Sequence, residues 1–104
     1  MSNVTKMNTV ALATAVEIDG KNVSEISLRK PSSGELRGLS LVDIMRMETN
    51  TMIKLLPRIT QPPLSPTQIG ALDPADLTDL AGKTVLFFVK KSQLEGQVLE
   101  LEAN

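Results

Sequence analysis

The chain has 104 residues, of which 41% are hydrophobic and 22% charged, and its formal net charge is -1. This length and balance fit one globular domain and exclude a chain that is disordered throughout. The sequence contains no His, Cys, Trp or Tyr, so a zinc site of the usual Cys and His ligands, a disulfide and a cysteine nucleophile are excluded.

The first predicted elements are two strands that form an antiparallel hairpin over residues 9–29. Apolar residues of the first strand recur at the two-residue period of a half-buried strand: Val10, Leu12, Val16 and Ile18. Asp19 and Gly20 follow, a pair that favours a hairpin turn because both residues tolerate positive φ angles. Residues 1–8 are polar and are predicted to be a flexible N-terminus.

The middle of the chain is predicted to be helical. Ser33 is a candidate cap for a short turn that ends at Gly38. Ser40 is a candidate N-cap for one or two helices over residues 41–58. Pro57 is expected to end or kink the second of them, because proline lacks the backbone N–H that continues the helix.

The last predicted helix has the clearest signals. Three prolines within residues 62–66 force an extended connection before it. Ser65 with Pro66 predicts a helix start, and Asp73 with Pro74 repeats the pattern. The helix from Pro74 to about Lys90 carries an apolar stripe at helical spacing, formed by Leu77, Leu80, Ala81, Thr84, Val85 and Phe88.

Together these elements predict an α+β fold, with an N-terminal antiparallel β-hairpin followed by three to four helices. We expect a single domain over residues 9–91 and a C-terminal tail over residues 92–104 that is disordered or a short helix. An isolated hairpin is marginally stable in water, so this one must pack on the helices or pair with another chain. Because the edges of the hairpin are free to pair with another copy of the chain, a homo-oligomer is one expected state.

The run from Val85 to Val89 is apolar on every side of the predicted helix. One interpretation is a fully buried central helix. The other is a partner-binding surface, since exposed apolar patches mark interfaces. On the second interpretation the binding candidates in this run are Leu86, Phe87, Phe88 and Val89, and a second set comes from the proline elbow, Leu56, Pro57 and Ile59.

Charged residues offer two further hypotheses. Basic side chains lie near predicted turns and form either a locally paired surface or a rim that binds an acidic partner: Arg29, Lys30, Arg37 and Arg58. The carboxylates of Asp73, Asp76 and Asp79 recur every three residues. This spacing permits a Mg²⁺ or hydrolase site, but helix capping and interaction with the helix dipole explain it better.

Several function classes are not favoured. No phosphate-binding, dinucleotide-binding or nucleophile-elbow motif is present, so we predict no enzymatic activity and no cofactor. Nucleic acid is a poor candidate partner, because 11 basic residues do not exceed 12 acidic ones and only two aromatic residues could stack on bases. No signal peptide and no stretch long enough to span a membrane is apparent, so no membrane partner is expected.

Three segments resemble one family in their order and spacing: Ile26–Pro31 with Gly34–Leu39, Leu55–Leu64, and Asp76–Lys83. The sequence Leu-Leu-Pro-Arg-Ile-Thr at residues 55–60 is the most specific of them. These segments are similar to the small tail assembly chaperones of Mu-like and related contractile-tailed phages and prophages. The resemblance covers about residues 10–90.

The resemblance implies a role in tail morphogenesis. Such chaperones bind the tape measure protein, help recruit tail tube subunits, act in the cytoplasm of the bacterial host and are not expected in the mature virion. It also implies a longer form of the same protein, made by translational frameshifting, as a partner. The alternatives are a small structural component of the tail or baseplate and a small regulatory module that binds other proteins.

Overall fold

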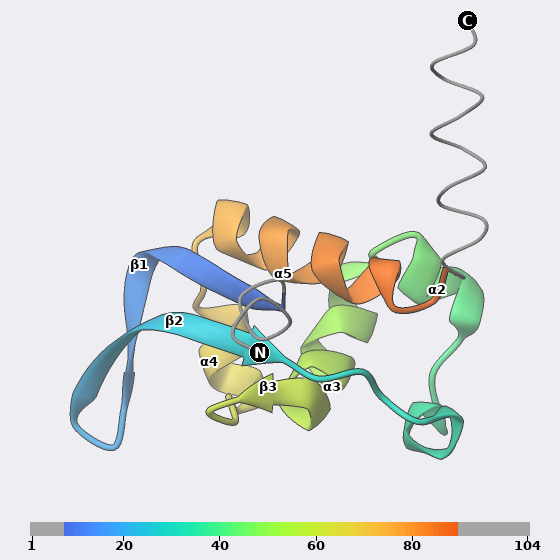
Figure 1. Cartoon of the computed structure of the whole chain (residues 1–104), viewed down its shortest axis with the longest axis horizontal. Coiled ribbons are helices and arrows are strands. Elements are labelled where there is room, and N and C mark those ends of the chain that lie inside the picture. The colour runs from blue at the N-terminus through green and yellow to red at the C-terminus, as the bar shows by residue number, and fades with distance from the viewer. Residues whose placement is uncertain (1–7, 90–104) are drawn as a thin grey trace, which may run out of the picture.

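The computed structural model describes residues 8–89 and has an α+β fold, which confirms the predicted class. An antiparallel sheet with the order β1–β2–β3 packs against a set of helices (Figure 1). Its strands are β1 (Thr9–Ile18), β2 (Lys21–Leu28) and β3 (Thr60–Gln61). The helices of the described residues are the 3-10 helix η1 (Ser33–Leu36) and the α-helices α2 (Leu41–Met45), α3 (Thr49–Ile59), α4 (Pro66–Gly70) and α5 (Pro74–Leu86).

The two predicted terminal segments lie mostly or wholly outside this range. The expected flexible N-terminus lies outside the described residues except for Asn8, whose backbone oxygen accepts a 2.8 Å hydrogen bond from the N–H of Leu28. The expected C-terminal tail, residues 92–104, lies wholly outside them.

The predicted hairpin is confirmed, together with its turn. Asp19 and Gly20 have φ angles of 52° and 81°, and Ile18 pairs with Lys21 across the turn. Positive φ at both central residues is the geometry of a type I′ turn, whose twist matches that of the strands it joins. The tip of the hairpin projects at one end of the molecule, and α2 lies at the opposite end (Figure 1).

A large bulge interrupts β1, and the apolar period did not predict it. Ala11 pairs with Glu25 and Val16 pairs with Val23, so the four residues from Leu12 to Ala15 lie opposite the single residue Ser24. A bulge bends its strand and leaves backbone groups without partners in the ladder. Val10 and Leu12, before the bend, are buried, whereas Val16 and Ile18, beyond it, are only partly buried.

A buried carboxylate on α5 fills the place of the missing strand partner. The Asp76 Oδ1 atom accepts a 2.7 Å hydrogen bond from the Ala13 N–H, and Oδ2 accepts a 3.1 Å bond from the Thr14 N–H. The Asp76 side chain is 3% exposed. Asp76 lies in the first turn of α5, where its carboxylate can interact with the helix dipole as predicted. Its hydrogen bonds to β1 also connect α5 to the sheet.

The core is organised around α3. Four of its side chains, Met52, Leu55, Leu56 and Ile59, are 0% exposed. The remaining buried apolar side chains come from the sheet, the other helices and two loops: Val10, Leu12, Ile26, Leu28, Ile44, Leu64, Ile69, Leu72, Leu80 and Ala81. The central helix is therefore α3, and the interpretation of Val85–Val89 as a fully buried central helix is wrong.

The predicted helix starts are confirmed at three places. The side chains of Ser40, Ser65 and Asp73 accept hydrogen bonds from the N–H groups of Asp43, Gln68 and Ala75, at 3.3, 3.1 and 2.8 Å. The cap of η1 is Ser32 and not Ser33.

The helix ends were predicted less well. Pro57 does not end α3, because the helix continues beyond it to Ile59. The last predicted helix ends at Leu86 and not near Lys90. Beyond it the N–H groups of Phe87, Phe88 and Val89 bond to carbonyls three residues back, which is the tighter 3-10 pattern common at helix ends.

We expect Asp76→Asn to lower the free energy of unfolding by about 1–3 kcal/mol, because the amide at this buried position offers one acceptor oxygen for two N–H groups and points its own NH2 at one of them. Urea denaturation followed by circular dichroism measures this loss. Asp79→Asn, an exposed carboxylate on the same helix, is the matched control and should change stability little. Equal stability of the two variants would show that the bonds to β1 do not hold α5.

Candidate functional site

The predicted arginines Arg29 and Arg58 lie in one cluster at the end of β2, but their donors bond within the chain. Arg29 Nη1 donates to Glu35 Oε1 at 2.9 Å, and Nη2 bonds to Glu35 Oε2 and, at 2.8 Å, to the backbone oxygen of Arg58. Arg58 Nη1 donates to the backbone oxygens of Glu35 and Arg37. The cluster ties together β2, η1 and the end of α3.

Electrostatics reinforce this cluster. The Arg29 guanidinium, assisted by the backbone N–H of Ser32, lowers the pKa of Glu35 from 4.5 to about 2. The hydrogen bonds with Glu35 also raise the pKa of Arg29. Both side chains remain partly exposed, at 43% and 31%. Such exposed pairs contribute little to stability individually, but a bidentate geometry fixes the orientation of the groups it joins.

The other two predicted basic residues, Lys30 and Arg37, have exposed side chains beside this cluster. A role of the four basic residues in binding a partner stays a prediction. The guanidinium groups of Arg29 and Arg58 bond within the chain, as in the locally paired alternative, whereas Arg37 takes part only through its backbone oxygen.

The predicted apolar binding residues fall into two groups. Leu56 and Ile59 are 0% exposed in the core, and Pro57 between them is half-buried. At the end of α5, Leu86 is 53% exposed, whereas Phe87, Phe88 and Val89 are half-buried. Phe87 and Phe88 pack against the core. Direct partner binding by these residues stays a prediction, and Leu86 is the one that already faces solvent.

Sequence reasoning missed an apolar surface on α2. Apart from Leu86, the large apolar side chains that the described residues expose all come from residues 41–47: Leu41 at 57%, Val42 at 58%, Met45 at 45% and Met47 at 43%. We call these four residues the α2 patch. Leu41, Ile44 and Met45 have the spacing of a buried helix face, but a five-residue helix buries only Ile44. The signal available in the sequence was the pair Met45 and Met47, because methionines suit adaptable interfaces when they are exposed.

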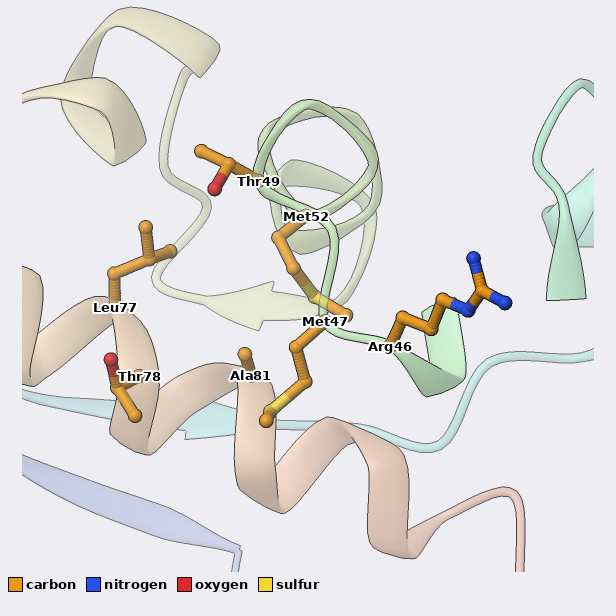
Figure 2. Close-up of a pocket in the computed structure, with 7 residues that line it drawn as sticks. All are labelled: Arg46, Met47, Thr49, Met52, Leu77, Thr78 and Ala81. Carbon is orange, nitrogen blue, oxygen red and sulfur yellow. The ribbon is translucent and has the colours of Figure 1, made fainter. Parts of the chain in front are cut away.

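One residue of the α2 patch, Met47, also lines a groove of about 200 Å³. One wall is the turn between α2 and α3 with the start of α3, and the other is α5 (Figure 2). The lining residues are Arg46, Met47, Thr49, Met52, Leu77, Thr78 and Ala81. The volume is below the roughly 300–1,000 Å³ of typical small-molecule sites, so the groove fits side chains of another protein better than a cofactor.

Hydrogen bonds fix the turn that forms one wall. The N–H of Met47 donates to the Ile44 oxygen at 2.9 Å, and the N–H of Glu48 donates to the Asp43 oxygen at 3.0 Å. These two bonds form a Schellman motif at the end of α2. Glu48 then caps α3 by accepting from the Thr51 N–H and hydroxyl at 2.8 and 2.7 Å, and the Thr51 bonds lower the pKa of Glu48. The wall is therefore preorganised.

The three regularly spaced aspartates do not meet. Asp73 caps α5, Asp76 bonds to β1, and Asp79 is exposed. Within residues 8–89 no group of three or more acidic side chains is arranged to hold a metal ion. Within the same range every helix is too short or too polar to cross a lipid bilayer.

Comparison with known proteins assigns the chain to a family. Residues 9–89 match the family model described as phage tail assembly chaperone proteins, E, or 41 or 14. The chain belongs to this family. The resemblance found in the sequence is thereby confirmed for the segment that contains the sheet, the arginine cluster, the α2 patch and the groove.

Two relatives of this tail assembly chaperone come from Escherichia phage P2. Tail assembly protein E is 39% identical over 87 residues, which cover 84% of this chain and 96% of the relative. Tail assembly protein E' is 40% identical over 84 residues, which cover 81% of this chain but only 59% of the relative. The chain thus spans little more than half of E' and nearly all of E. No solved structure matches the chain.

The arginine cluster predicts a particular acid sensitivity. Because the folded-state pKa of Glu35 is about 2, below its usual 4.5, the stabilisation it provides is present above about pH 4.5 and is lost as the pH falls toward 2. Glu35→Gln should therefore be less stable than wild type at neutral pH and equally stable near pH 2. Urea denaturation at a series of pH values measures this difference.

Added salt should reduce the difference, because the pair is exposed. Glu25→Gln, which removes an exposed carboxylate on β2 outside the cluster, is the control. A constant gap between wild type and Glu35→Gln at every pH would contradict the assignment of the effect to the Arg29–Glu35 pair.

Proposed function

We propose that this chain binds the tape measure protein during phage tail assembly and helps to recruit tail tube subunits around it. The observation that carries the proposal is the family match over residues 9–89, together with relatives that are named tail assembly proteins. The chain acts by binding and not by catalysis, since it has no His or Cys to supply the usual proton shuttle or thiolate. It acts in the host cytoplasm and leaves before the tail is complete.

The exposed α2 patch and the groove support a binding role. An assembly factor must hold a partner and release it, and small apolar surfaces with few contacts are typical of transient interfaces. The α2 patch offers four exposed apolar side chains beside a preorganised groove. The half-buried Phe87 and Phe88 are less suited to this purpose, because they already pack against the core.

We expect co-expression of this chain with the tape measure protein encoded beside it to keep that protein soluble and to yield a complex on affinity purification. The reason is that the chaperone covers apolar surface that otherwise aggregates. The measurement is the soluble fraction of the tape measure protein with and without this chain. An insoluble, unbound tape measure protein, with this chain present in purified particles, would favour a structural tail component instead.

We also propose that a longer form of the chain exists. The P2 relatives support this, because matches of similar length fill nearly all of E but only 59% of E'. Slippage of the reading frame is favoured by homopolymeric codons, which could encode Phe87–Phe88 or Lys90–Lys91. Mass spectrometry of infected cells should detect a second product that shares residues 9–89. A gene with no overlapping downstream frame and no such codon run would refute the longer form.

A further inference from the structure

The break between α2 and α3 lies in a stretch whose residues favour one continuous helix. Arg46, Met47 and Glu48 separate the two helices, and Arg46 still has right-handed helical angles. The backbone therefore leaves helical geometry only at Met47, whose φ angle is 56°, and at Glu48, which is extended. Methionine, arginine and glutamate are all strong helix formers. Residues 41–59 contain no glycine, and their one proline lies in the last turn of α3.

Met47 is the strained residue of this turn. It occupies the left-handed region, at the position after a helix end where glycine is usual and a side chain is unfavourable. Its side chain is 43% exposed at the groove, so packing restrains it little (Figure 2). The turn is held instead by the bonds from the Met47 and Glu48 N–H groups to the oxygens of Ile44 and Asp43. In a straight helix both N–H groups would keep a partner, four residues back along the chain.

The apolar residues of the two helices share one register. Leu41 and Met45 precede Met52 by eleven and seven residues, which is close to three and two full helical turns. Met52 is 0% exposed, as are Leu55 and Ile59, which continue the same stripe along α3. Leu41 and Met45, in contrast, are 57% and 45% exposed. The sequence thus carries one apolar stripe through both helices, and the turn at Met47 interrupts it.

A single side chain anchors α2 to the domain. Ile44 is the buried residue of this helix and is 0% exposed. Its burial favours the bent arrangement, whereas the positive φ of Met47 opposes it. A short element with one anchor and one strained joint is the kind of segment that opens locally or changes arrangement without unfolding the rest of a domain. A retained strain of this type points to a functional conformational change.

We propose that the turn at Met47 and Glu48 is a hinge between two forms of the chain. The main form is bent, and in the minor form residues 41–59 make one straight helix. In the straight form Met47 would point about 140° away from Met52, because it precedes Met52 by five residues, while Leu41 and Met45 would join the side that carries Met52. The groove wall and the α2 patch therefore exist together only in the bent form.

The hinge is a device that forms or removes the candidate binding surface. The inference goes beyond the proposed function and does not rest on it, because it concerns only the chain's own backbone. Bending brings Met47 to the groove beside Leu77 and Ala81, and straightening withdraws it. A partner that needs the bent surface would be released when the helix straightens, since a ligand shifts such an equilibrium only through its different affinities for the two forms.

The test is nuclear magnetic resonance of the full chain, with 13C at the methionine methyl groups and at the backbone Cα atoms. Relaxation dispersion of the Met45 and Met47 methyl groups should reveal exchange on the μs–ms timescale with a minor form populated at about 0.1–10%. Saturation-transfer measurements should give helical Cα shifts for Met47 and Glu48 in that minor form. Coil shifts at these residues and throughout α2 would show local unfolding instead and would overturn the proposal.

Substitutions at the hinge should move the balance in opposite directions. Met47→Gly relieves the strain of the bent form and lowers helix propensity, so the straight form should fall about tenfold or more. Met47→Ile should raise it about threefold or more, since a β-branched side chain is more strained at a positive φ angle. Ile44→Ala weakens the anchor of α2 and offers a second route to the same increase.

Asp19→Gly is the matched control, because it places glycine at the other non-glycine positive φ of residues 8–89, in the hairpin turn. It should leave the exchange at Met47 unchanged. The hinge is refuted if wild type, Met47→Ile and Ile44→Ala all lack a helical minor form, or if Met47→Gly and Met47→Ile show equal exchange. No partner takes part in these measurements, so their outcome is independent of whether the chain binds the tape measure protein.

Discussion

The contact between Asp76 and the bulge of β1 joins α5 to the sheet. The bulge leaves the N–H groups of Ala13 and Thr14 without partners in the β1–β2 ladder, and backbone N–H groups need acceptors. The two oxygens of Asp76 satisfy both, across 63 and 62 residues of sequence. The next residues of α5, Leu77 and Thr78, form a wall of the groove. The carboxylate therefore helps to position the candidate binding site relative to the sheet, together with the buried Leu80 and Ala81 of the same helix.

Local signals predicted the fold where short-range chemistry decides it. The turn at Asp19–Gly20 and the helix starts at Ser40, Ser65 and Asp73 are determined by residues at most three positions apart. The bulge was not predictable, because alternation of Val10, Leu12, Val16 and Ile18 fits both a regular and a bulged strand. The bulge is matched by Asp76, whose approach to β1 is a tertiary contact that no local period reports.

The candidate site was harder to predict than the fold. Arg29 and Arg58 are separated by 29 residues, so the sequence could not show that one donates to the backbone of the other. The α2 patch was missed because the spacing of Leu41 and Met45 matches a buried helix face, while the short helix leaves both exposed. The positive φ of Met47 is also invisible in a sequence, since methionine is not a residue expected at such a turn.

The arginine cluster and the α2 patch differ in what a partner must displace. To engage Arg29 or Arg58, a partner has to replace hydrogen bonds that already fix β2, η1 and α3, so the gain from new contacts is offset by the bonds lost. Within residues 8–89 nothing covers the apolar side chains of the α2 patch, so a partner displaces water from them, which is favourable. Four side chains and a groove of about 200 Å³ make a small interface, and small interfaces release their partners readily. Such a surface suits the reversible binding that we propose for this chain.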